Sequence, residues 1–185
     1  NKIDLKNLNL IEEMLRQIKI EFQTTKNDRQ TILINNHDVT DEIRSPSITN
    51  FVSQVAALEI VRTALTRQQR GIGEVGGIVA EGRDIGSTVF PDAEVKFFLT
   101  ASPKERARRR AIDLESRGFP VPTIKDLEQQ IQERDKLDSN REISPLTKAK
   151  DAIEIITDGM DINEVTSSLI NHFHERIPQE VWPIH

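Results

Sequence analysis

Residues 95–118 read VKFFLTASPKERARRRAIDLESRG, and this stretch decides the fold. Val95 to Leu99 is a short apolar run of the length expected for a buried strand. Ser102, Pro103 and Glu105 follow it, and a capping serine with a proline and an acidic residue in the next turn predicts a helix start. A buried strand that leads directly into a helix is the unit from which α/β proteins with parallel sheets are built.

The same alternation continues on both sides of this unit. Ile78-Val79-Ala80 upstream and Ala152 to Ile156 downstream are predicted as further strands. Helix starts are predicted at Thr123, for a helix to about Ser139, and at Asp161. The sequence therefore predicts an α/β fold with a parallel sheet.

The amino-terminal third breaks this alternation. Leu8 to Ile18 has helical periodicity, and from Thr49 to Gln69 the pattern is again helical. Between them, Ile20–Gln23 and Thr31–Asn35 are predicted as strands joined by the polar turn Lys26-Asn27-Asp28. We therefore expect a small β-containing subdomain inserted at about residues 17–52 of a single domain spanning 1–185.

Composition excludes several classes of function. The net charge of −5 argues against a protein that binds nucleic acid through its overall field. The absence of cysteine excludes disulfides, thiolate metal sites and cysteine nucleophiles, and it is compatible with a cytoplasmic location. No apolar run approaches the roughly 20 residues that span a bilayer. The histidines do not have the spacing of metal ligands, so no metal site on the chain is predicted.

Two glycine-containing motifs bear on nucleotide binding. The stretch from Gly71 to Gly76 fits the dinucleotide pattern G-x-G-x-x-G, but it follows a predicted helix and precedes a predicted strand. The dinucleotide site needs the reverse order, so a loop is favoured. The P-loop motif G-x-x-x-x-G-K-S/T does not occur among the 185 residues.

Gly82-Arg83-Asp84 comes at the carboxyl end of a predicted strand, the edge of an α/β sheet where ligands bind. Glycine lets the backbone approach a ligand, and Arg83 and Asp84 offer opposite charges. The alternative is a mutual surface ion pair.

Charged residues also gather on the two predicted helices. Arg134, Asp138 and Arg141 share one face if the helix continues through Arg141, and such a face can hold a phosphate and a ribose hydroxyl. An exposed helix with ion pairs explains the same pattern. For the arginines at 106, 108, 109 and 110, a solvated helix face is the default interpretation.

Together these segments resemble bacterial cytidylate kinases, which are nucleoside-monophosphate kinases. The resemblance implies their three-layer α/β fold with a parallel sheet, here without the amino-terminal strand and the P-loop. The resemblance extends from about Asp4 to Leu169 and depends on motifs in a fixed order. The motifs are Asp41–Arg44, Ser53–Ala57, Val61-Arg62, Glu81–Gly86 with Val89–Ala93, Glu105–Ala107 with Arg109-Arg110, Arg134-Asp135 with Asp138, Asn140-Arg141 and Pro145-Leu146.

The resemblance implies roles for ten residues. Ser53, Arg62 and Asp84 would contact the cytosine. Arg83 and Arg141 would bind the CMP phosphate, and Arg134 and Asp138 would engage the ribose side. Arg106, Arg109 and Arg110 would be the catalytic arginines of a lid at about 104–122, which closes over the phosphoryl group in transfer.

The family also implies ATP with Mg²⁺ as the phosphoryl donor, CMP or dCMP as the acceptor, and a monomeric kinase domain. Its P-loop binds ATP, so we expect the chain to be an amino-terminally truncated part of a longer protein and inactive by itself. The ending Ile177–Trp182 resembles the cyanobacterial form, in which the kinase follows a pantoate-activating ligase. The alternative function is a non-catalytic nucleotide-binding or interaction module without an ATP site.

Overall fold

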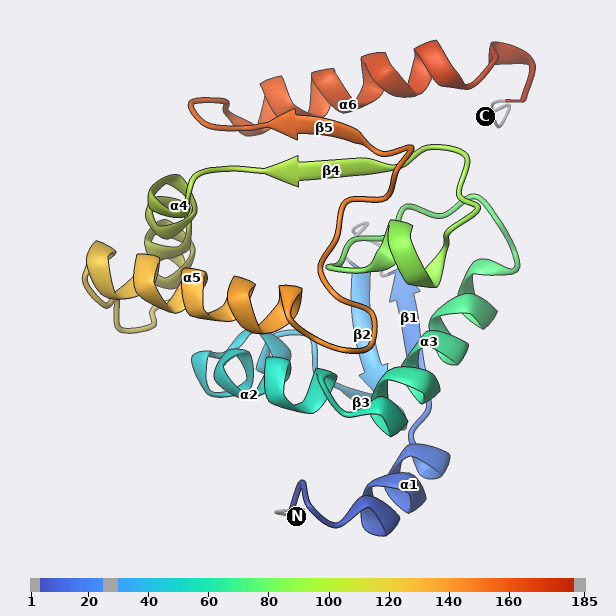
Figure 1. The fold of residues 1–185 in the computed structure, drawn as a ribbon, viewed down its shortest axis with the longest axis vertical. Coiled ribbons are helices and arrows are strands. Elements are labelled where there is room, and N and C mark those ends of the chain that lie inside the picture. The colour runs from blue at the N-terminus through green and yellow to red at the C-terminus, as the bar shows by residue number, and fades with distance from the viewer. Residues whose placement is uncertain (1–3, 25–29, 182–185) are drawn as a thin grey trace. The chain divides into compact units, whose positions relative to one another are not determined.

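The computed structural model describes residues 4–24 and 30–181, and they form two compact units (Figure 1). Unit 1 comprises Asn1–Val79 with Arg141–Ser144, and unit 2 comprises Ala80–Asn140 with Pro145–His185. No described helix is both long and apolar enough to cross a membrane.

Unit 1 combines a small antiparallel sheet with helices. The strands are β1 (Ile20–Thr24), β2 (Gln30–Ile34) and β3 (His37–Asp38), in that order across the sheet. The helices are α1 (Leu8–Gln17), α2 (Pro46–Ala56) and α3 (Glu59–Gly73), with a 3₁₀ turn at Glu42–Arg44. Its core is formed by Ile11 and Leu15 of α1 against Val61 of α3.

The predicted hairpin is confirmed. β1 pairs antiparallel with β2 from Ile20↔Ile34 to Thr24↔Gln30, and the predicted turn at 26–28 lies outside the described residues. The short strand β3 was not predicted. Asn35 and Asn36 precede it with φ of 49° and 67°, the paired positive values that a tight hairpin turn requires and that asparagine tolerates.

The helical pattern predicted over Thr49–Gln69 is confirmed, and the structure divides it into two helices. Pro46 begins α2, and Leu58 separates α2 from α3 with extended backbone at φ −73° and ψ 122°. Leu58 packs against the core of Ile11, Leu15 and Val61. No glycine or proline marks this break, so local sequence contains no signal for it.

Unit 2 contains the strand-to-helix units predicted for the parallel sheet. The strands β4 (Phe97–Thr100) and β5 (Ile153–Ile156) pair in parallel, with Phe97 opposite Ile153. The helices are α4 (Pro103–Ser116), α5 (Ile124–Ser139) and α6 (Ile162–Arg176), with a π-helical turn at Ile85–Val89 and a 3₁₀ turn at Gln179–Val181. Figure 1 shows α4 beside α5, and Ala107, Leu114 and Leu127 form the core between them.

The predicted strand at residues 78–80 is wrong, because the structure has extended chain without strand pairing there. A strand is stable only when its backbone groups bond to a neighbour. Among the described residues the parallel sheet has only β4 and β5, and the side chain of Val79 is fully exposed. Residues 78–80 therefore have the apolar composition of a strand, but no strand in the described part of the chain pairs with them.

The helix starts were predicted well because they depend on local contacts. Ser102 Oγ accepts the backbone N–H of Glu105 at 3.2 Å, and Thr123 Oγ1 accepts that of Asp126 at 3.1 Å. Asp161 and Glu164 form a reciprocal capping box at the start of α6.

Replacing Asp161 with alanine should lower the free energy of unfolding by about 0.5–2 kcal/mol, because the first-turn N–H groups of Asn163 and Glu164 lose their acceptor. Thermal unfolding measures the effect. Asp161→Asn retains a capping oxygen and is the control. Equal melting temperatures for wild type and the alanine variant would show that this cap does not stabilise α6.

Candidate functional site

Asp135 of α5 joins two arginines that come from different elements of unit 2. Arg83, which precedes the π-helical turn, donates from Nη1 to Asp135 Oδ1 at 2.7 Å. Arg106, in the first turns of α4, donates from Nη2 to Asp135 Oδ2. All three side chains are 25–32% exposed, so the bridge is sheltered from water and still accessible.

A second carboxylate lies beneath this bridge. Asp138 is 3% exposed, and its Oδ2 lies 3.6 Å from Arg83 Nε and 3.7 Å from Arg134 Nε. Arg134 and Asp138 therefore share one face of α5, as their spacing predicts. We call Arg83, Arg106, Arg134, Asp135 and Asp138 the arginine cluster.

The arginine cluster contains three positive and two negative side chains. Burial lowers the pKa of Arg134, and the positive charge of Arg83 lowers it further. Burial alone would raise the pKa of Asp135, but hydrogen bonds from Arg106 and Arg83 outweigh it and keep that pKa below its ordinary value. The cluster is therefore short of negative charge, and a bound anion would be stabilised there.

Asp84 lies next to the arginine cluster in sequence and is 5% exposed. Its backbone carbonyl accepts the N–H groups of Thr88 and Val89, at 2.8 and 3.2 Å, in the π-helical turn. A Cβ added to Gly82 would lie 2.8 Å from Ile85 Cγ1. Packing against Ile85 therefore favours glycine at this position, and the close approach to a ligand stays a prediction.

The three predicted lid arginines have different surroundings. Arg106 belongs to the arginine cluster. Arg109 donates to Thr157 Oγ1 at 2.9 Å and to the Thr157 and Met160 carbonyls at 2.5 and 3.3 Å, which ties α4 to the end of β5. Arg110 pairs with Asp113 at 2.8 Å, and its charge also lowers the pKa of Arg134.

The other three predicted residues belong to unit 1. Ser53 lies on α2 and Arg62 on α3, both partly buried. Arg141 follows the end of α5, and its Nη2 donates to the carbonyl of Ser144 at 2.7 Å. Because α5 ends at Ser139, Arg141 does not continue the helical face of Arg134 and Asp138.

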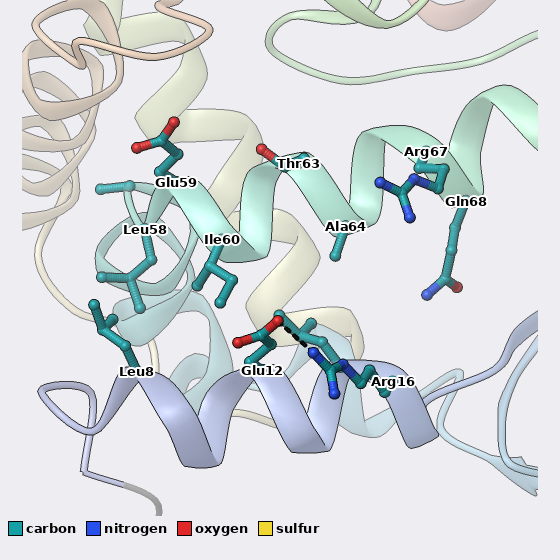
Figure 2. A pocket seen from close by; sticks show the side chains of 12 residues that line it. Leu8, Glu12, Arg16, Leu58, Glu59, Ile60, Thr63, Ala64, Arg67 and Gln68 are labelled. Carbon is teal, nitrogen blue, oxygen red and sulfur yellow. Dashed lines mark hydrogen bonds and ion pairs between the residues drawn. The ribbon is translucent and has the colours of Figure 1, made fainter.

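Unit 1 also has an apolar groove between α1 and α3 (Figure 2). Leu8, Leu58 and Ile60 lie along it, and the ion pair of Glu12 with Arg16, at 2.7 Å, lies at its edge. None of the predicted site residues lines it. Arg62 is two positions from Ile60, which places it on the opposite face of α3.

Sequence reasoning did not assign a site role to Asp135. Arg83 and Asp135 are 52 residues apart, and helical spacing shows only neighbours on the same helix. The sequence did contain one sign that a carboxylate such as Asp135 would matter. These segments are rich in arginine, and partly buried guanidinium groups need carboxylate partners.

Among residues 4–24 and 30–181, no three potential metal-ligating side chains come together. Mg²⁺ at nucleotide sites is commonly held by one or two carboxylates together with waters and substrate phosphates. Magnesium remains a prediction as the companion of ATP.

The family model and the similar proteins indicate the same family. The family model described as "Cytidylate kinase" matches residues 1–175. A bifunctional pantoate ligase/cytidylate kinase of Prochlorococcus marinus is 57% identical over 183 residues, which are 99% of this chain and 35% of that protein. The protein of the same name from Synechococcus sp. (strain CC9311) is 54% identical over 173 residues, 94% of this chain and 35% of its own length. The chain thus spans about a third of these curated relatives.

Proposed function

Because the chain belongs to the cytidylate kinase family, we propose that the gene product that contains it transfers a phosphoryl group from ATP to CMP or dCMP. The products would be CDP and dCDP. The names of the relatives support a kinase that acts on cytidylate, and they support a pantoate ligase as a fused partner.

The observation that carries this proposal is the arginine cluster. Three guanidinium groups lie close to two carboxylates, which leaves a surplus of positive charge. The negative phosphate of a nucleoside monophosphate would interact favourably with that surplus. A phosphate can accept several charge-assisted hydrogen bonds from arginines at once. In this assignment Arg83 binds the phosphate, and Arg134 and Asp138 engage the ribose side. The resemblance also assigns Arg141 to the CMP phosphate, and that role stays a prediction.

Arg106, with Arg109 and Arg110, is assigned to the phosphoryl group in transfer. In phosphoryl transfer the protein acts mainly by positioning and by stabilising charge that spreads over the phosphoryl oxygens. Arg106 is the best supported of the three, because it already shares a carboxylate with Arg83. The Arg109 side chain is held by Thr157 and Met160, so a direct role would require it to exchange those carbonyls for phosphate oxygens.

Selection of cytosine is assigned to Asp84 together with Ser53 and Arg62. A carboxylate only accepts hydrogen bonds, so it suits the exocyclic amine of cytosine, while a hydroxyl and a guanidinium suit the acceptors of the ring. Asp84 is supported in this role by its burial at 5% exposure, because a buried carboxylate discriminates strongly between partners that donate and partners that do not. No ATP-binding residues are assigned, because the sequence contains no P-loop motif.

Calorimetric titration of the gene product with CMP and with cytidine tests the phosphate half of the proposal. CMP should bind at least about 100-fold more tightly, because each charge-assisted hydrogen bond to the phosphate contributes roughly 1.5–3 kcal/mol. Raising the salt concentration should reduce this difference by screening the arginines. Equal affinities for CMP and cytidine would show that the arginine cluster does not bind the substrate phosphate.

A further inference from the structure

We propose that Asp135 is the positioning residue that holds Arg83 and Arg106 ready for the phosphates of the reaction. The inference rests on the proposed kinase function and extends it. Asp135 is assigned no contact with substrate, so it would act through the two arginines.

The geometry of the bridge suits this role. Each oxygen of Asp135 accepts one N–H group, Oδ1 from Arg83 and Oδ2 from Arg106. Neither arginine is bound by Asp135 in the bidentate fork that would occupy two of its donors. A guanidinium has five N–H donors, so each retains donors for a phosphate oxygen after its contact with Asp135.

Asp135 also reduces the electrostatic repulsion between the guanidinium groups of Arg83 and Arg106. Two partly buried guanidinium groups repel each other, and their long side chains would separate if no anion lay between them. A carboxylate on the rigid helix α5 keeps both in place before the substrate arrives. Fixing donors in advance removes part of the ordering cost at binding and at the transition state.

The neighbouring carboxylate cannot replace this function. Asp138 lies 3.6 Å from Arg83 Nε, which is an ion-pair distance longer than a normal hydrogen bond, and its second arginine is Arg134 of its own helix. Asp135, in contrast, accepts a hydrogen bond from both Arg83 and Arg106. Its loss would free both side chains together.

Steady-state kinetics of Asp135→Asn in the gene product tests the inference. The amide offers one acceptor oxygen where the carboxylate offers two, so one arginine is released and the other is held by a neutral acceptor without the ion-pair attraction. We expect kcat/KM for CMP to fall about 10- to 100-fold, with a higher KM for CMP, a lower kcat and an unchanged KM for ATP. Glu154→Gln, which removes the exposed ion pair with Lys148, is the matched control and should retain wild-type kinetics.

Two further variants separate positioning from simple stability. Asp135→Glu retains the charge and both oxygens but moves them by one methylene, so it should fold and still raise the KM for CMP severalfold. In an Arg83→Met background, Asp135→Asn should cost much less than in the wild type, because one of the two side chains it positions is already absent.

The outcomes are distinct. A fall in kcat that matches the loss of folded protein, with the KM for CMP unchanged in both Asp135 variants, would overturn the positioning role. Full independence of the Asp135 and Arg83 effects would also overturn it, as would tighter CMP binding in Asp135→Asn. If the wild-type gene product does not phosphorylate CMP, the proposed function fails, whereas an active wild type with unaffected Asp135 variants contradicts this inference alone.

Discussion

Replacing Arg83 with methionine should lower kcat/KM for CMP by about 100-fold or more in the gene product. Methionine retains the apolar bulk of the side chain but removes a charge-assisted contact to the phosphate, worth up to roughly 3 kcal/mol. It also leaves the arginine cluster with two positive and two negative side chains, so no surplus positive charge remains to attract an incoming phosphate. The KM for ATP should change little.

Lys148→Met is the control for this experiment. Lys148 is 43% exposed and pairs with Glu154 at 2.6 Å, while Arg83 is 32% exposed and pairs with Asp135 at 2.7 Å. Both variants therefore lose a similar ion pair of unit 2, but only Arg83 belongs to the arginine cluster. Similar losses of activity in the two variants would mean that Arg83 matters through stability and does not bind the phosphate.

Replacing Asp84 with alanine should narrow the ratio of kcat/KM for CMP to that for UMP. The carboxylate accepts from the cytosine amine, but it would oppose a carbonyl oxygen in uracil, where neither group can donate. Loss of a charged hydrogen bond of this kind costs about 10- to 100-fold in kcat/KM, and the loss should fall mainly on CMP.

Steady-state kinetics with CMP and UMP, with the KM for ATP as the control, measures this effect. The competing explanation is that the buried side chain of Asp84 only supports its loop. A structural role of that kind would reduce both activities equally. An unchanged ratio of CMP to UMP would therefore refute the assignment of Asp84 to the base.

The parts of the fold that were predictable depend on contacts within a few residues. The starts of α4, α5 and α6 are examples, because a serine, a threonine and an aspartate cap N–H groups two or three positions further along the chain. The separation of α2 from α3 at Leu58 depends instead on packing against Ile11, which lies far earlier in the chain. Local sequence contains no sign of such a contact.

The same distinction applies to the site. The resemblance of the motifs indicated Arg83, Arg134 and Asp138, and the structure brings these three into one cluster. Asp135 differs, because its contacts with Arg83 and Arg106 join the loop before Ile85, helix α4 and helix α5. Segments so far apart in sequence meet only in the folded unit. At residues 78–80 the local signal was misleading. The apolar composition there predicts a strand, but no strand among the described residues pairs with it.

The relative kcat/KM of the gene product for CMP, dCMP, AMP and GMP, with MgATP as the donor, tests the assignment of the base site most directly. We expect CMP and dCMP to be phosphorylated much faster than either purine nucleotide, because Asp84, Ser53 and Arg62 are assigned to a small ring that carries an exocyclic amine. Preference for AMP or GMP would contradict that assignment.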